Sequence, residues 1–121
     1  MKRFEIWLVI GSGGLYPAVV LSSDSACAAL DYVTIIPLTT DLASWQLQSH
    51  VLISCHGLCQ PHRALCEQIT TLNKRAFSRR LGYVDEAFDR FAINRAVANH
   101  LHLEITPYVK EESIYGVPGD F

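Results

Sequence analysis

Residues 9–21 read Val-Ile-Gly-Ser-Gly-Gly-Leu-Tyr-Pro-Ala-Val-Val-Leu, a glycine-rich stretch between two apolar runs. A dinucleotide-binding loop also places glycines after an apolar run, but that loop opens a helix whose amides hold the pyrophosphate. Here the residues after Gly14 are largely β-branched or aromatic and include Pro17, which favours a strand. The stretch therefore predicts a hairpin with a glycine-rich connection, and it argues against a dinucleotide loop.

Short apolar runs separated by polar turns continue on both sides of this hairpin. Strands are expected over residues 5–10, 16–22, 31–38, 50–54 and 64–70. Ser23 or Asp24 is expected to cap a helical turn over residues 26–30. Because Pro37 has no backbone N–H, the third strand is expected to lie at a sheet edge or to bulge at this residue.

The remaining chain contains a basic segment and an amphipathic helix. Residues 73–81 carry four cations and are expected to end at Gly82, and their plain interpretation is a solvated helix face. A helix is predicted over residues 84–102, with Asp85 as its N-cap. Its apolar residues recur at spacings of three and four: Phe88, Phe91, Ala92, Ala98 and Leu101. Five strands and one terminal helix indicate a mainly β fold, built as a small antiparallel barrel or curled sheet.

Length and composition fit one domain, because 121 residues of which 50% are hydrophobic suffice for a single core. The formal net charge of −2 excludes a bulk polycation, so a nucleic-acid contact needs a local basic patch. No apolar run approaches the roughly 18 residues of a membrane span. The first apolar run starts with Glu5 and breaks at the glycines, unlike a signal peptide. We expect a cytoplasmic protein whose four cysteines stay thiols.

Five short motifs follow one another along the chain. Residues 2–9 read Lys-Arg-Phe-Glu-Ile-Trp-Leu-Val, residues 16–22 read Tyr-Pro-Ala-Val-Val-Leu-Ser, and residues 33–40 end in Pro-Leu-Thr-Thr. Residues 65–74 read Leu-Cys-Glu-Gln-Ile-Thr-Thr-Leu-Asn-Lys, and Gly-Tyr-Val at 82–84 leads into the predicted helix. In this order the motifs resemble the MazF/PemK family of toxins from toxin–antitoxin systems.

The resemblance implies an SH3-like small antiparallel β-barrel with a C-terminal amphipathic helix, assembled as a homodimer. It also implies a growth inhibitor that cleaves single-stranded RNA through the ribose 2′-hydroxyl and leaves a cyclic phosphate. Such an endoribonuclease is metal-independent and needs no cofactor, and a cognate antitoxin silences it with an acidic segment over the RNA groove. On this basis residues 1–103 form the toxin domain and residues 104–121 a C-terminal tail.

Two positions of the resemblance carry the expected catalysis. The family's catalytic pair is the arginine of its R-P motif and the threonine that closes the third strand. Thr39 matches the threonine, whereas Tyr16 occupies the arginine position. A guanidinium neutralises a pentavalent phosphate with two parallel charged hydrogen bonds, which a phenol cannot do. A catalytically degenerate relative that binds an antitoxin or another protein, as the fold-related gyrase poison CcdB does, is therefore the alternative.

Several cations are candidates for RNA contacts. The expected RNA-binding residues are Arg3, His50, Arg63, Lys74, Arg75 and Arg79. The first three are expected at the groove edge, where one of them could supply the charge that Tyr16 lacks. His50 also has the ring chemistry of a general base. The other three belong to the basic segment, whose local positive charge suits phosphates.

Residues 55–66 hold three cysteines and two histidines, from which a tetrahedral zinc site could draw Cys55, Cys59, His62 and Cys66. The segment lacks the two separated knuckles of a structural zinc motif, and a thiol in an expected strand behaves as a small hydrophobe. We therefore expect no metal site.

The acidic tail has two interpretations. Residues 104–121 contain four carboxylates and one lysine. They could imitate an antitoxin segment over the chain's own groove, or remain a mobile solubilising tail.

Overall fold

The computed structural model describes residues 1–42, 47–55 and 57–103. Its strands are β1 (Glu5–Gly11), β2 (Gly14–Val20), β3 (Tyr32–Thr39), β4 (His50–Ile53), β5 (His62–Leu65), β6 (Thr70–Asn73) and β7 (Phe77–Tyr83). Its helices are α1 (Asp24–Ala29), the 3₁₀-helix η1 (Lys74–Ala76) and α2 (Ala87–Leu101). The tail expected at residues 104–121, and the antitoxin-mimic hypothesis with it, falls outside the described residues.

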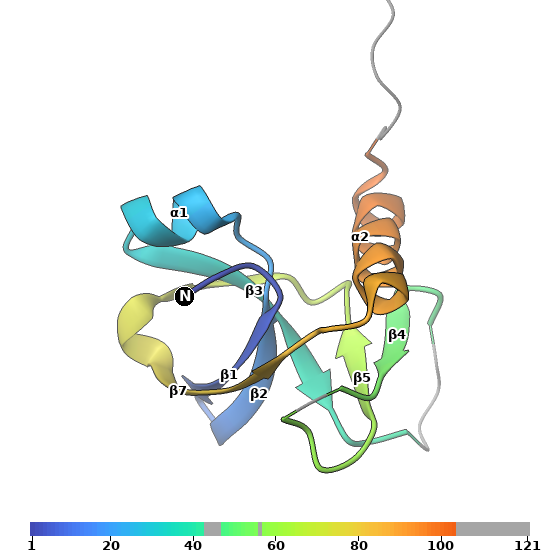
Figure 1. The fold of residues 1–121 in the computed structure, drawn as a ribbon, viewed down its shortest axis with the longest axis horizontal. Coiled ribbons are helices and arrows are strands. Elements are labelled where there is room, and N and C mark those ends of the chain that lie inside the picture. The colour runs from blue at the N-terminus through green and yellow to red at the C-terminus, as the bar shows by residue number, and fades with distance from the viewer. Residues whose placement is uncertain (43–46, 56, 104–121) are drawn as a thin grey trace, which may run out of the picture.

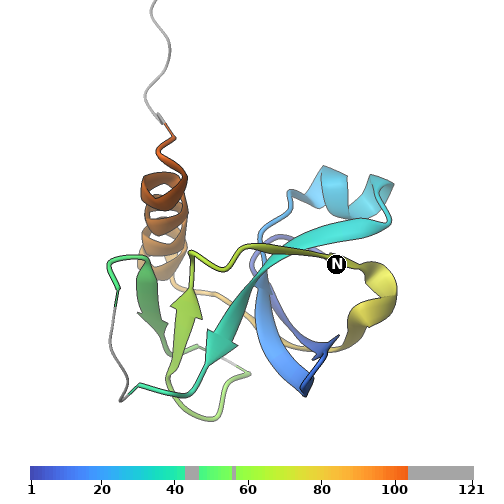
Figure 2. The same ribbon diagram turned by 180° about the vertical axis from the view of Figure 1, so that it is seen from behind.

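All seven strands form one antiparallel sheet in the order β4-β5-β3-β2-β1-β7, with β6 paired to β3 outside this path. The sheet curls so that β1, β2, β3 and β7 surround one end of the molecule, while α2 stands beside β4 and β5 at the other (Figure 1). From behind, β3 crosses from the curled half to β5 (Figure 2). The ladders among the described strands do not close, but the barrel-like sheet with a C-terminal helix confirms the predicted fold class.

The glycine-rich stretch forms the predicted hairpin. β1 and β2 pair up to Gly11 opposite Gly14, so Ser12 and Gly13 make a two-residue turn. Gly14 has a φ of +116°, a conformation that favours glycine over any residue with a Cβ. The backbone therefore requires glycine here for a turn.

Alternating side chains of the sheet enter two hydrophobic clusters, one on each face. The first includes the fully buried Ile36 and Ile93 and lies between the sheet and α2. The second lies inside the curl around Val9, where Trp7 packs edge-on against Phe77 with ring centroids 6.0 Å apart. Two clusters on opposite faces of one continuous sheet explain why half the sequence is apolar.

Pro37 lies in the middle of β3, so the expected edge position or bulge is wrong. On one side of β3, the pairing with β6 ends at Ile35 and the pairing with β5 begins at Leu38. On this side of β3, Pro37 thus lies in the gap between β6 and β5, where no partner strand needs a hydrogen bond from a backbone N–H.

The strand predicted over residues 64–70 is in fact two strands. The chain leaves the sheet after β5 in a turn, closed by the hydrogen bond that the Gln68 N–H donates to the Leu65 carbonyl at 2.9 Å. It then returns as β6 to pair with β3. The segment thus contributes to two separate strands, β5 and β6, with a turn between them.

The helix expected in the basic segment is also wrong beyond its first turn. After η1 the chain extends as β7 and pairs with β1, which places Arg79 opposite Leu8. Gly82 does not end this element but is buried within it. Pairing with the otherwise open edge of β1 satisfies backbone groups that a solvated helix would not satisfy there.

Helix α2 starts slightly later than predicted. Glu86 occupies the N-cap position and makes no capping bond with its side chain, so the assignment of Asp85 as N-cap is wrong. In the described part of the chain, no helix combines the length and hydropathy that crossing a membrane requires.

The side of α2 that packs on the sheet is formed by Ile93, Ala96 and Val97. Phe88 and Phe91 point away from this core and are 75% and 56% exposed. The apolar spacing read from the sequence therefore marks two surfaces of the helix, of which one is uncovered.

The loop before β5 tests how tightly the sheet is packed. Gly57 has a φ of +97°, and a Cβ there would overlap the backbone of Leu81 and Gly82 in β7. Gly57→Ala is expected to lower the free energy of unfolding by about 1–3 kcal/mol, measured by urea denaturation. Gly13→Ala is the matched control, because a Cβ at Gly13 meets nothing within 4 Å. Equal midpoints for both variants would contradict the close contact.

Candidate functional site

Thr39 is the last residue of β3. On one side of this strand, the ladder with β2 ends at Ala18 opposite Pro37; on the other side, Arg63 of β5 is directly opposite Thr39. The half-buried hydroxyl of Thr39 accepts a hydrogen bond from the Asp41 N–H at 3.1 Å. The hydroxyl is thereby held in a turn at the end of the sheet.

Tyr16 lies on β2 beside this point. Its half-buried ring packs across Gly11, where an added Cβ would be 2.6 Å from the ring. If the β2–β3 register continued for two more residues, Tyr16 would be opposite Thr39, and by alternation both side chains project from the same face. Tyr16 and Thr39 therefore lie on neighbouring strands, both beyond the last pair of the β2–β3 ladder.

Arg63 contributes a guanidinium to the same row. It is opposite Thr39 on β5, and directly opposed side chains have Cβ atoms about 5 Å apart. Arg63 is only 5% exposed, and its Nη2 donates to the Leu42 carbonyl at 2.9 Å. A buried charge is screened less by solvent than a surface charge.

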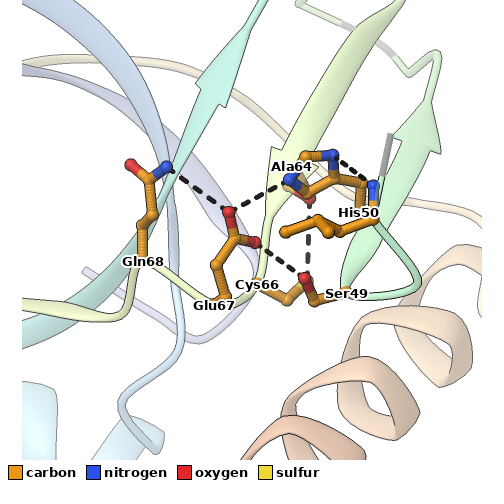
Figure 3. A network of polar contacts seen from close by, with 7 residues as sticks. Ser49, His50, Ala64, Cys66, Glu67 and Gln68 are labelled. Carbon is orange, nitrogen blue, oxygen red and sulfur yellow. Dashed lines mark hydrogen bonds and ion pairs between the residues drawn. The ribbon is translucent and has the colours of Figure 1, made fainter. Parts of the chain in front are cut away.

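His50 is held in a different network, at the start of β4 (Figure 3). Its Nε2 lies 3.0 Å from a carboxylate oxygen of Glu67, and its Nδ1 accepts from the Leu47 N–H at 3.3 Å. Ser49 donates to the other Glu67 oxygen at 2.9 Å. The ring is thus anchored to Glu67. In the β4–β5 ladder His50 is opposite Leu65, which lies two residues after Arg63 on β5. The geometry gives His50 a structural contact and does not direct it at Thr39.

Sequence reasoning missed Glu67 as the centre of this network. Burial raises the pKa of its carboxyl, but hydrogen bonds from His50, from its own backbone and from Ser49 outweigh that effect, so the pKa lies below the ordinary 4.5. The available signal was its position directly after the buried Cys66, where an acid needs partners.

Arg3 uses its donors within the fold. Its guanidinium donates to the Leu21 carbonyl at 2.6 Å and to the Asn94 side chain at 2.7 Å, and it stacks over Phe4 at 4.9 Å. These contacts tie the N-terminus to α2 and place Arg3 apart from the Thr39 row.

The basic segment is divided between two elements. Lys74 and Arg75 lie on η1, and the Lys74 N–H donates to the Asp31 carbonyl at 2.9 Å. Arg79 lies exposed on β7, whereas its neighbour Arg80 projects from the opposite face, 3.6 Å from the Glu5 carboxylate. The expected single cluster is therefore two separate groups of cations.

The four candidate zinc ligands Cys55, Cys59, His62 and Cys66 do not form a metal-binding group. Among the described residues, no three side chains of His, Cys, Asp or Glu are placed to hold a metal ion. Burial, followed by the nearby Asp85 and Asp89, raises the pKa of Cys55 to about 11, and burial raises the pKa of Cys66 to about 12. Both thiols are therefore protonated near neutral pH.

The sequence matches, over residues 2–101, the family described as PemK-like, MazF-like toxins of type II toxin–antitoxin systems. This match spans every described strand and all of α2. The chain belongs to this family. The resemblance drawn from its five motifs is thereby confirmed.

Solved structures of MazF-type toxins share the architecture of this family member. A mycobacterial endoribonuclease in complex with its cognate antitoxin is 21% identical, with 88% of this chain and 99% of that chain covered and a TM-score of 0.77. The Mycobacterium tuberculosis toxin MazF-mt6 is 25% identical, covering 83% and 98%, with a TM-score of 0.73. A MazE–MazF structure from Deinococcus radiodurans is 17% identical, covering 86% and 97%, with a TM-score of 0.72. A search of curated proteins gave no match.

The Glu67 network predicts a pH-dependent contribution to stability. Because the pKa of Glu67 is lower in the folded chain than its ordinary 4.5, the carboxylate stabilises the fold above about pH 4.5, and this contribution is lost as pH falls. Glu67→Gln is expected to cost about 1–2 kcal/mol at pH 7 and progressively less towards pH 3, in urea unfolding at each pH. Glu86→Gln removes the same charge at an exposed site and serves as the control. A cost that does not change between pH 7 and pH 3 would exclude this role of Glu67.

Proposed function

We propose that this toxin-family chain is an endoribonuclease that cleaves single-stranded RNA at the row formed by Tyr16, Thr39 and Arg63. The observation that carries the proposal is the direct cross-strand pairing of Thr39 with Arg63. Family membership and the similarity to a mycobacterial endoribonuclease support the reaction class. The pairing supplies a positive charge beside Thr39, whereas the usual arginine position holds Tyr16.

The chemistry follows from the charges of the reaction. The 2′-hydroxyl oxygen bonds to the adjacent phosphorus, the bond from phosphorus to the 5′-oxygen breaks, and a cyclic phosphate remains. The 2′-hydroxyl proton goes to solvent or a base, and the departing 5′-oxygen takes up a proton. Negative charge grows on the phosphate as its pentavalent state forms, so a fixed guanidinium stabilises that state more than the substrate.

Each residue of the row has a distinct part in this proposal. The Thr39 hydroxyl, oriented by the Asp41 N–H, donates to a phosphate oxygen. The buried Arg63 guanidinium provides a positive electrostatic field from the face of the sheet that carries Thr39. The phenol of Tyr16 donates a hydrogen bond, since its hydroxyl has no partner among the described residues. No metal or cofactor enters these steps.

The proposed partners are single-stranded RNA, a cognate antitoxin and a second copy of this chain. The mycobacterial relative in complex with its antitoxin supports the second. The uncovered side of α2 supports the third, because Phe88 and Phe91 border a hollow of about 300 Å³ that also includes Val51. Two adjacent phenylalanines on one helix are costly to leave exposed to water. A two-fold pairing of this face would bury their side chains in both copies of the chain.

A catalytically degenerate binding module is the second candidate. The observation that favours it is the tyrosine in the arginine position, since a single phenol does not replace a bidentate charged contact. The two candidates differ in whether RNA is cut.

Thr39→Ala tests the proposed reaction. Removing one donor to the transition state is expected to slow cleavage of a labelled mixed-sequence RNA by about 100-fold or more, with the cyclic-phosphate product identified by mass spectrometry. Thr40→Ala, the exposed neighbouring residue, is expected to cleave like the unaltered chain. If the unaltered chain leaves the RNA intact, or if Thr39→Ala cleaves at the same rate, the binding-module candidate is favoured.

A Phe88→Glu, Phe91→Glu double variant tests the proposed self-association. Two carboxylates on the uncovered face of α2 are expected to convert a dimer into a monomer because they resist burial, measured by sedimentation velocity. Leu30→Glu places the same charge on an exposed leucine near α1 and should leave the dimer intact. A monomeric unaltered chain at micromolar concentration would contradict the pairing.

A further inference from the structure

A groove of about 340 Å³ lies between the outer face of the β1–β2–β7 sheet and the loop that precedes β5. Its apolar lining comes from Leu8, Pro17 and Leu81 of the three strands and from Leu58 of the loop. Its polar lining comes from Cys59, Gln60, His62 and Arg79. This volume is at the lower end of small-molecule sites, about 300–1,000 Å³.

The groove is built by the fold. Leu8 is opposite Pro17 on one side and opposite Arg79 on the other, so the three residues form one row across the sheet. The loop is fixed against β7 by the close approach of Gly57. His62 is held by its Nδ1, 2.8 Å from the Gln60 carbonyl. Both walls are therefore in place before any ligand arrives.

The lining has the chemistry of a nucleotide site. Its residues include one permanent cation, Arg79, and no carboxylate, so it favours an anion over a cation. The flat apolar surface suits the face of an unpaired base, and Gln60 offers an amide at the rim for the base edge. A base, a sugar and one phosphate use all three features together.

The groove and the proposed cleavage site share two strands. Pro17 directly follows Tyr16 on β2, and His62 directly precedes Arg63 on β5, so successive residues of each strand belong to one and then to the other. By alternation the groove and the Thr39 side chain lie on opposite faces of the same sheet end. An RNA strand bound at both places would have to round this end of the sheet.

We propose that this groove binds one unpaired nucleotide of the RNA, with its base on Leu8 and Pro17 and its phosphate on Arg79. This inference rests on the proposed function for its ligand. It assigns Arg79 a contact distinct from that of Lys74 and Arg75, which lie on η1.

Cys59 provides a direct probe of occupancy. All four cysteines lie in the described part of the chain, and Cys59 alone is exposed. The raised pKa values of the other three thiols, about 11 for Cys55 and about 12 for Cys66, slow their alkylation. Maleimide labelling near neutral pH therefore reports on the groove through Cys59.

The experiment uses the full chain and a single-stranded 2′-deoxy oligonucleotide of mixed sequence, which lacks the hydroxyl needed for cleavage. Saturating oligonucleotide is expected to slow Cys59 alkylation about fivefold or more. An abasic oligonucleotide of equal length keeps the phosphates but lacks bases, and it is expected to give little protection. Duplex DNA is expected to give none, because its bases are paired.

Arg79→Ala tests the phosphate contact. It is expected to weaken oligonucleotide binding by about tenfold and to reduce the slope of log affinity against log salt by about 0.7, the value for one phosphate on a single strand. Lys2→Ala, another exposed cation outside the groove, is the matched control. Circular dichroism confirms that both variants fold.

The outcomes separate this inference from the proposed function. If the oligonucleotide protects Cys59 but the chain does not cleave RNA, nucleotide binding in the groove is supported and the proposed nuclease activity is overturned. If the chain cleaves RNA but Cys59 is equally reactive in the free and in the saturated chain, nucleotide binding in the groove is overturned. Equal protection by the abasic oligonucleotide, or protection by an acidic peptide and not by nucleic acid, would also overturn it.

Discussion

The missing N–H of Pro37 is the constraint on which the rest of the structure depends. A residue that cannot donate to a ladder has to lie where no partner strand requires it, and β3 satisfies this by changing from β6 to β5 around it. The change of partner brings β5 alongside Thr39 and opens the sheet at the same end. The catalytic row and the groove that we propose both belong to this one break in pairing.

In the proposed site, Arg63 is a different source of charge from the arginine usual in the family. A guanidinium in the usual position would approach a phosphate from β2, whereas here the cation lies on the strand to the other side of Thr39. Its near-complete burial makes it a fixed electrostatic source. In the proposed reaction, this fixed charge stabilises the developing negative charge of the phosphate, and the phenol of Tyr16 donates a single hydrogen bond.

Local features were predictable from the sequence, and pairings between distant residues were not. The Gly-Ser-Gly-Gly connection and the β-branched residues after it identified the hairpin, because turn chemistry and strand propensity act within a few residues. The partner change at Pro37, the pairing of Thr39 with Arg63 and the capture of residues 77–83 by β1 depend on register between segments far apart in sequence. The helical spacing of Phe88 and Phe91 identified an apolar surface, but spacing alone does not state whether another element covers it.

A double-mutant cycle on cleavage tests most directly whether Thr39 and Arg63 act as one unit. The kcat/KM values of Thr39→Ala, Arg63→Met and the double variant would be compared with the unaltered chain, with thermal unfolding to confirm that each is folded. Residues that act on the same phosphate as a unit give non-additive losses. The account predicts that the double variant is no slower than the slower single variant. Losses that multiply in the double variant, or an Arg63→Met chain as active as the unaltered one, would contradict it.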